Sequence, residues 1–127
     1  MPGVPVPSYA VDLLADAMIL LNGHERFALR PQTYFRLVQP YQSHTRIPDN
    51  FIYLYAFGLR PEEHQPSGTV NMSRIDNAQL KFDMTNVANL PAPASQWSGS
   101  VGRVAIYATN YNVFRVMSGM GGLAYSN

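Results

Sequence analysis

Residues 51–57 have the sequence FIYLYAF, and this stretch decides the predicted fold. Aromatic side chains occupy every second position, and aliphatic side chains occupy the three positions between them. A β-strand points successive side chains to opposite faces, so both faces of this strand would be apolar. Such a strand is expected inside a sandwich or at an interface. The sequence therefore predicts a buried strand here.

Two further stretches on either side also favour strands. Residues 34–38 (YFRLV) are aromatic and aliphatic apart from Arg36, and Pro40 closes the run. In residues 78–84 the polar side chains alternate with apolar ones. That alternation predicts a half-buried strand with one wet face.

The remaining segments are short and separated by Pro, Gly and Asn. Two more strands are expected at residues 101–108 and 111–117, whereas residues 11–17 fit either a short helix or the start of a strand. Asn22-Gly23 predicts a turn, because both residues tolerate positive φ. About six short strands without a long helix indicate an all-β protein, specifically a jelly-roll β-sandwich.

Composition excludes several functional classes. Charged residues make up 13% of the chain, against about 25% in a typical soluble domain, and eight of the nine cations are Arg. The absence of Cys excludes a disulfide scaffold, a thiolate metal site and a Cys nucleophile. A net charge of +1 gives no electrostatic case for nucleic acid. Few charges and many Arg fit a surface that other subunits cover.

The polar residues do not form a recognisable catalytic or metal-binding motif. His24, His44 and His64 are each 20 residues apart in predicted turns, so nothing in the sequence brings them together. Glu62 and Glu63 are adjacent and would point apart in extended backbone. We therefore expect no catalytic residue, no metal site and no cofactor, and we expect the protein not to be an enzyme.

Two alternatives remain open from the residues alone. A jelly-roll carbohydrate- or ligand-binding module could use loop aromatics such as Trp97 or Tyr41. A metal-dependent enzyme of the cupin type would share the fold, but its ligand motif is missing.

Longer stretches carry a more specific signal, namely residues 22–27, 34–48, 52–78 and 107–127. Together they closely resemble the C-terminal region of the major capsid proteins of nucleocytoplasmic large DNA viruses. That group includes iridovirus-like, phycodnavirus-like, mimivirus-like and asfarvirus-like capsids. Matches of this length are far more specific than a short motif.

The resemblance implies a double jelly-roll protein, with three chains in a pseudo-hexagonal capsomer and capsomers tiling an icosahedral shell. It implies a homotrimer that contacts neighbouring capsomers or minor capsid proteins, without direct nucleic-acid binding or a membrane span. The expected location is the virion, with assembly in the host cytoplasm. The expected organisation is a Pro-rich N-terminal arm at residues 1–16 and a partial C-terminal jelly-roll capsid domain at residues 17–127.

The same resemblance implies structural and assembly roles for one set of residues. Residues 62–68 would connect two strands, Arg74 and Asp76 would open the next strand, and residues 119–127 would end the second jelly roll. The full set is Arg36, Gln39, Pro40, His44, Thr45, Arg60, Pro61, Glu62, His64, Pro66, Gly68, Arg74, Asp76, Asn110, Tyr111, Arg115, Gly119, Gly121 and Gly122.

Length is the main departure from the family, whose members are several-fold longer. A jelly roll without its first strands leaves an unpaired sheet edge or an open face. We therefore expect the chain to need a partner chain that completes the sheet, or to aggregate. The expected buried packing residues are Phe51, Tyr53, Tyr55, Phe57, Leu80, Phe82, Tyr107 and Phe114.

Overall fold

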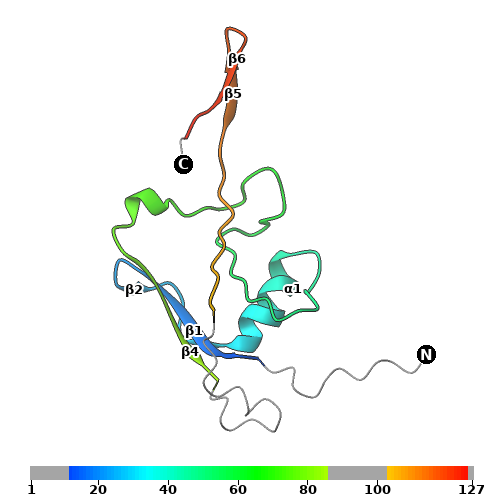
Figure 1. Ribbon diagram of the computed structural model, residues 1–127, viewed down its shortest axis with the longest axis vertical. Coiled ribbons are helices and arrows are strands. Elements are labelled where there is room, and N and C mark those ends of the chain that lie inside the picture. The colour runs from blue at the N-terminus through cyan, green and yellow to red at the C-terminus, as the bar shows by residue number, and fades with distance from the viewer. Residues whose placement is uncertain (1–11, 86–102, 126–127) are drawn as a thin grey trace, which may run out of the picture.

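The computed structural model describes residues 12–85 and 103–125. Figure 1 shows a sheet beside a short helical segment, and a separate hairpin that projects from the other end of the molecule. In the sheet, β1 (Leu14–Leu21) lies between β4 (Ala78–Met84) and the two short strands β2 (His24–Glu25) and β3 (Arg30–Pro31). The hairpin consists of β5 (Phe114–Met117) and β6 (Met120–Leu123). All pairings are antiparallel.

The central strand answers the question left open at residues 11–17. The described part of that stretch enters a strand, and Ile19 pairs with Leu80 across β1 and β4. β1 begins at Leu14, inside the range expected for the N-terminal arm. The strand expected at residues 78–84 is present as β4, although every residue in it is exposed.

The predicted turn at Asn22-Gly23 is confirmed. Both residues have positive φ, 52° and 79°, as a two-residue hairpin turn that matches strand twist requires. Asn22 does more than turn the chain, because its Oδ1 accepts hydrogen bonds from the backbone amides of Asp76 (2.9 Å) and Asn77 (3.1 Å). The side chain thereby anchors the start of β4 to the end of β1.

Replacing Asn22 with alanine is expected to lower the free energy of unfolding by about 2–3 kcal/mol. The change removes the acceptor of two backbone hydrogen bonds and strains a residue at positive φ. Asn22→Asp keeps an acceptor oxygen and is the matched control, expected to stay near wild type. Urea unfolding at one protein concentration measures both, and equal losses in the two variants would contradict the assigned role.

Residues 34–38, expected as a strand, are instead helical. A π-helical turn, η1 (Tyr34–Val38), leads directly into the short α-helix α1 (Gln39–Ser43). The Phe35 side chain is 5% exposed, and its packing against Phe27 and Tyr34 outweighs the β-propensity of the run. Pro40 has no amide hydrogen to donate and lies in the first turn of α1, where helices tolerate proline.

Residues 51–57, the strongest strand prediction, do not form a regular strand. Their backbone donors bind the helical segment: Leu54 N donates to Phe35 O (3.2 Å), and Ala56 N donates to Gln39 Oε1 (3.3 Å). The prediction was wrong because these donors have helical-segment acceptors in place of a neighbouring strand. Phe51 remains 43% exposed.

The strand expected at residues 101–108 is also wrong where the structure describes it, since residues 103–108 have no strand. The run at residues 111–117 forms a strand only in its second half, β5. Arg74 lies in the 3-10 turn η2 (Met72–Arg74) and Asp76 precedes β4 by two residues, so neither opens the strand. The loop expected at residues 85–100, with Trp97, lies outside the described residues after Thr85.

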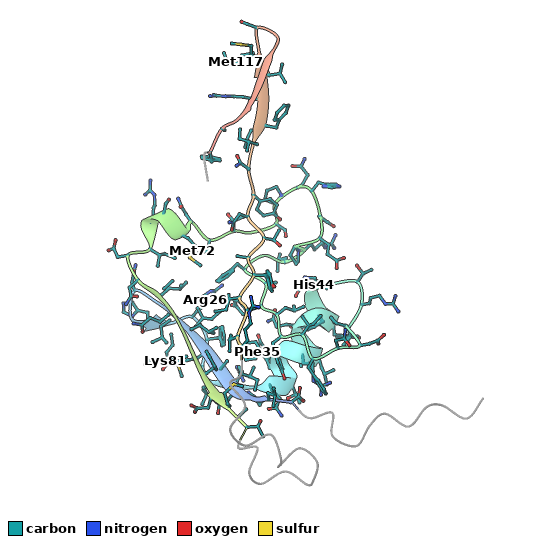
Figure 2. The ribbon with its side chains drawn as sticks, in the orientation of Figure 1. Arg26, Phe35, His44, Met72, Lys81 and Met117 are labelled. Carbon is teal, nitrogen blue, oxygen red and sulfur yellow. The ribbon has the colours of Figure 1, made fainter. Side chains whose placement is uncertain are left out.

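The core of the described residues is small. Its buried hydrophobic side chains are Ala17, Leu20 and Phe35, joined by buried Gln39 and fully buried Pro40. Figure 2 shows Phe35 between the sheet and the helical segment, whereas Met117 lies on the distant hairpin. Of the expected buried residues, five are exposed in the single chain, namely Phe51, Leu80, Phe82, Tyr107 and Phe114.

Candidate assembly surface

Arg36 ties three segments of the described fold together. Its Nε lies 3.1 Å from Asp12 Oδ1, and the Tyr53 hydroxyl donates to the same oxygen at 2.8 Å. The Arg36–Asp12 contact is an ion pair without an aligned hydrogen bond at Nε. The guanidinium also lies 5.4 Å from the centroid of the Phe51 ring, within cation–π range. The arrangement holds residues 51–53 against η1.

Burial raises the pKa of the Tyr53 phenol to about 12, and the hydrogen bond and charge of Asp12 act in the same direction. A phenol whose pKa is higher in the folded state stabilises the fold while it is neutral. This contribution is complete below pH 10, the ordinary phenol pKa, and is lost as the pH rises through about 12.

The chain is therefore expected to lose stability between pH 10 and 12, and Tyr53→Phe is expected to reduce that loss. Urea unfolding at a series of pH values, with tyrosinate absorbance in parallel, measures it. Tyr41→Phe is the control, because Tyr41 is 80% exposed and should leave the alkaline loss unchanged. Parallel curves for wild type and Tyr53→Phe would contradict the assignment.

Gln39 and Pro40 lie inside the fold. The Gln39 Nε2 donates to the Tyr34 hydroxyl at 2.7 Å, and its Oε1 accepts from Ala56 N. A buried amide of this kind must find partners, since an unpaired one costs about 1–3 kcal/mol. These residues therefore support the packing of residues 51–57 and do not reach a partner surface.

The loop at residues 58–68 is closed at its base by two glycines. A Cβ on Gly58 would lie 2.6 Å from the carbonyl oxygen of Gly68, and Gly68 has φ of +147°. Inside the loop, Ser67 Oγ accepts from Arg60 N at 2.7 Å, and Arg60 Nη1 lies 3.1 Å from Glu63 Oε1. Residues 62–68, expected to connect two strands, lie in this loop, but residues 51–57 before it form no regular strand. The close approach of Gly58 gives a steric reason for glycine at position 68.

Glu62 joins this 58–68 loop to the end of α1. Its Oε1 accepts from Thr45 N at 3.2 Å, and its Oε2 accepts from the Thr45 hydroxyl. These hydrogen bonds lower the pKa of Glu62, and the nearby His44 adds to the effect. Pro61 is half-buried, whereas His64 and Pro66 are exposed on the loop. The structure thus brings His44, Thr45 and Glu62 together and leaves His64 at the surface.

The C-terminal hairpin turns at Ser118 and Gly119, which have φ of 51° and 74°. Gly121 leaves room for an aromatic ring, because a Cβ there would lie 2.7 Å from Cζ of Phe114. Arg115 and Gly122 pair across the strands. Asn112 brackets the hairpin base: its Nδ2 donates to Tyr125 O at 2.8 Å, and its Oδ1 accepts from Tyr125 N. Asn110 and Tyr111 are exposed.

Exposed apolar side chains are concentrated along the C-terminal segment. Residues 103–125 are exposed at every position, including large apolar side chains on both strands of the hairpin. The most exposed are Ile106 (72%), Tyr107 (90%) and Met120 (76%). An isolated two-stranded hairpin is at best marginally stable in water. Continuous apolar exposure of this kind marks an interaction surface.

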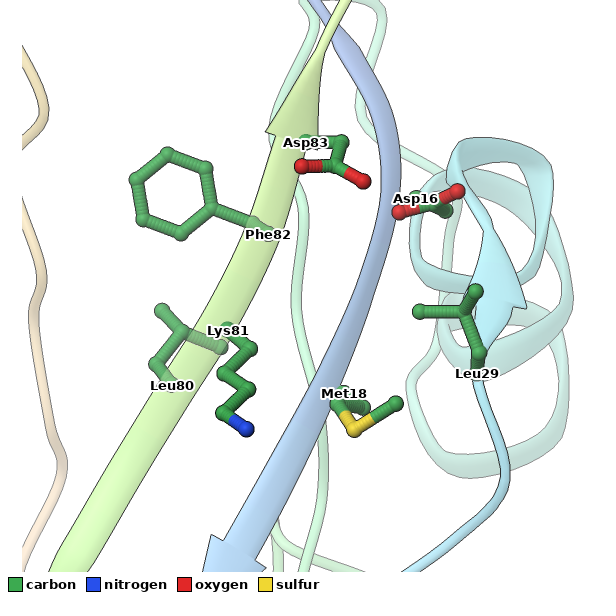
Figure 3. A pocket seen from close by; sticks show the side chains of 7 residues that line it. All are labelled: Asp16, Met18, Leu29, Leu80, Lys81, Phe82 and Asp83. Atoms are coloured by element: carbon green, nitrogen blue, oxygen red, sulfur yellow. The ribbon is translucent and has the colours of Figure 1, made fainter.

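The described residues offer no candidate metal site, and their groove is open to solvent. Residues 12–85 and 103–125 contain no cluster of three or more His, Asp or Glu that could hold a metal ion. The groove in Figure 3 is open, and its lining mixes Asp16, Lys81 and Asp83 with apolar side chains from β1, β4 and Leu29. No helix in the described part of the chain is both long enough and apolar enough for a membrane span.

Several structurally important residues were missed by the sequence interpretation. They are Asp12, Asn22, Gly58 and Asn112, whose side-chain or close contacts described above reach residues 10 to 55 positions away. Tyr53 was expected as a packing residue, but its hydroxyl bond to Asp12 was not predicted. Their partners are fixed only by the fold. The one available signal was local: Asn22 was recognised as a turn residue, but its side-chain role was not.

These features describe a chain made mainly of β-strands, with a short helical segment and with exposed apolar surface. The comparisons with known proteins supply the class, since residues 3–122 match the family described as large eukaryotic DNA virus major capsid protein. The chain belongs to that family.

Named relatives and a solved structure support the assignment. The chain is 60% identical over 114 residues to the major capsid protein of Chrysochromulina ericina virus and 43% identical over 112 residues to capsid protein 1 of Acanthamoeba polyphaga mimivirus. A structure of the PBCV-1 virus capsid superposes with a TM-score of 0.76 at 44% identity over 94% of this chain. The family is thus structural and not enzymatic.

The matches cover most of this chain but a minor part of each relative. The chain corresponds to 18% of the Chrysochromulina ericina virus protein, 19% of the mimivirus protein and 32% of the PBCV-1 capsid chain.

Proposed function

We propose that the chain is the shell-forming C-terminal jelly-roll part of a major capsid protein, acting by assembly into trimeric pseudo-hexagonal capsomers of an icosahedral virion. The observation that carries the proposal is the exposed apolar C-terminal segment in a chain of this family. A segment exposed at every described position is suited to burial by other protein surface. Its partners would be two further copies of the whole protein, neighbouring capsomers and minor capsid proteins, with assembly in the host cytoplasm.

Under this proposal we distinguish two groups among the assembly residues. Arg36, Gln39, Pro40 and Gly68 shape the fold through contacts inside the chain. The second group comprises exposed residues that we propose to contact neighbouring subunits, namely Arg60, His64, Pro66, Arg74, Asp76, Asn110, Tyr111 and Arg115.

A chimeric capsid protein tests the proposal. The matching region of the Paramecium bursaria Chlorella virus 1 major capsid protein, which is 47% identical, is replaced by this chain. Light scattering and electron microscopy are expected to show trimers that assemble like the parent. The control chimera carries Phe35→Ala and should fail to assemble. A soluble chimeric monomer with the wild-type chain would overturn the proposal.

The carbohydrate-binding alternative makes a different prediction for the isolated chain. A binding module would retain specific glycans on an array as a monomer, and Tyr41→Ala would abolish that binding. The capsid proposal expects no glycan retention above background. Specific retention lost in Tyr41→Ala would favour the alternative.

A further inference from the structure

The turn between β1 and β2 contains a chemically reactive pair, Asn22 and Gly23. In an Asn-Gly pair the backbone nitrogen of the glycine can attack the side-chain carbonyl carbon of the asparagine. Glycine has no Cβ, so no side chain hinders the approach of the attacking nitrogen. The asparagine side chain can thereby lose its amide without an enzyme, in the reaction called deamidation.

The reaction needs water as its only co-reactant. A bond forms between Gly23 N and Asn22 Cγ, the Cγ–Nδ2 bond breaks, and ammonia leaves with the proton of the Gly23 amide. The intermediate is a five-membered succinimide ring, which water then opens. Cleavage at Cγ gives an aspartate at position 22. Cleavage at the main-chain carbonyl carbon gives isoaspartate, in which the main chain runs through Cβ and Cγ.

The native turn holds the two reacting atoms apart. Asn22 and Gly23 have φ of 52° and 79°, and they connect the paired residues Leu21 and His24 as a two-residue type I′ turn does. The first central residue of such a turn has ψ of about +30°. At that ψ the Cβ of an L-residue lies nearly opposite the next backbone nitrogen across the Cα–C bond. Ring closure needs the two atoms on the same side, so Asn22 must first rotate far about ψ.

Contacts with the start of β4 resist this rotation. Asn22 Oδ1 accepts hydrogen bonds from the amides of Asp76 (2.9 Å) and Asn77 (3.1 Å), and Asn22 N donates to Asn77 O at 2.8 Å. The carboxamide and the main chain of Asn22 are thus both tied to one segment. Burial does not supply the protection, because Asn22 and Gly23 are both exposed in the described chain.

We propose that Asn22-Gly23 is a deamidation site that the native turn masks. The reaction proceeds only while the turn is open. Its rate in the folded chain therefore equals its rate in the unfolded chain multiplied by the open fraction. Local separation of the turn from the start of β4 is enough to open it, since the contacts that hold Asn22 lie there.

The isoaspartate product cannot rebuild the turn that masks the site. Its main chain is longer by one methylene group between positions 22 and 23, which does not fit a two-residue type I′ turn. A chain modified while unfolded is therefore expected to refold poorly. The aspartate product keeps the normal main chain and an acceptor oxygen for the amides of Asp76 and Asn77, so it is expected to refold.

A comparison of the folded and unfolded 127-residue chain tests the masking. The chain is held at neutral pH with and without guanidinium chloride, circular dichroism records its fold, and mass spectrometry follows the peptide that contains Asn22. We expect deamidation in buffer to be at least about tenfold slower than in denaturant. Asn112 is the internal control, because the branched side chain of Val113 hinders attack in both conditions. Equal rates at Asn22 in the two conditions would overturn the proposal.

A proline variant tests the contacts with β4. Asp76→Pro removes one amide that donates to Asn22 Oδ1, and Ile75 before it already has the extended backbone (φ −98°, ψ 115°) that a following proline requires. Deamidation in buffer is expected to become severalfold faster than in wild type. Asp76→Ala is the matched control, since it removes the same side chain and keeps the amide. A folded Asp76→Pro chain with the wild-type rate would overturn the role of this contact, and if the variant does not fold, the comparison of wild type in buffer and denaturant decides alone.

Gly23→Ala isolates the chemistry, because it is compared with wild type in denaturant, where the φ of the native turn has no influence. The added methyl group beside the attacking nitrogen is expected to slow deamidation of Asn22 severalfold. Wild-type chains aged in denaturant are then diluted into buffer, and isoaspartate is expected to be enriched in the fraction that fails to refold. An unchanged rate in Gly23→Ala, or isoaspartate spread evenly over both fractions, would contradict the assigned reaction. These measurements concern one peptide of a single chain, so they can fail while the proposed capsomer assembly stands.

Discussion

Replacing Phe35 with alanine is expected to unfold the helical side of the molecule, at a cost of about 3–5 kcal/mol. The Phe35 side chain is 5% exposed, and its ring centroid lies 5.1 Å from that of Tyr34 and 5.6 Å from that of Phe27. Domains have only about 5–15 kcal/mol of stability in total. Ala17 and Leu20 are the two other buried core hydrophobic residues of the described part, so few core contacts remain to offset the loss of the Phe35 ring.

The effect should extend to residues 51–57, because the Phe35 carbonyl accepts the Leu54 amide. Urea unfolding followed by circular dichroism measures the change, and hydrogen exchange at Leu54 tests the extension. Tyr41→Ala is the matched control, an aromatic on α1 that is 80% exposed and should change stability by less than about 0.5 kcal/mol. A Phe35→Ala chain as stable as Tyr41→Ala would contradict the assigned core.

Turn chemistry and one strand could be predicted from the sequence because their causes are local. Asn22-Gly23 carries its own preference for positive φ, and residues 78–84 alternate as a strand does. The jelly-roll class came from the number of short runs and from the long family-like stretches. The fold class and the family resemblance are confirmed by the family match and the capsid superposition, although several of the predicted strands are absent.

The failures share a physical cause. The apolar side chains of residues 51–57 favour a buried strand, but a strand also needs a neighbouring strand to accept and donate its backbone hydrogen bonds. Here the Leu54 and Ala56 amides bind Phe35 O and the Gln39 side chain. The YFRLV run became helical for a related reason, since burial of Phe35 among aromatic rings outweighs local propensity.

Candidate assembly residues show the same limit. The resemblance gave Arg36 and Gly68 as candidate assembly residues, whereas their contacts with Asp12 and Gly58 inside the chain depend on partners far along the sequence. No local spacing predicts that Gly58 and Gly68 meet. A pattern therefore located the loop, and only the three-dimensional arrangement explains how it closes.

The second prediction with a large effect concerns the base of the 58–68 loop, where Gly58→Ala is expected to lower the free energy of unfolding. The new Cβ would lie 2.6 Å from the Gly68 carbonyl oxygen, a backbone atom that cannot rotate away as a side chain can. Overpacking of this kind costs about 1–3 kcal/mol, and Gly58→Val should cost more because it adds two methyl groups. Gly68→Ala should be comparably harmful, since its φ of +147° is accessible essentially to glycine alone.

We expect Gly58→Ala to open the 58–68 loop locally in addition to lowering the stability of the whole chain. Separating Gly58 from Gly68 pulls Arg60 N from Ser67 Oγ and Glu62 from Thr45, so proteases should cut the 58–68 loop in Gly58→Ala faster than in wild type. Gly122→Ala is the matched control, because its Cβ would meet nothing within 4 Å and its φ needs no glycine. Limited proteolysis with mass spectrometry, together with urea unfolding, separates the two levels. Unchanged cleavage and stability in Gly58→Ala would contradict this prediction, because the backbone at residues 58 and 68 could then separate without loss of stability.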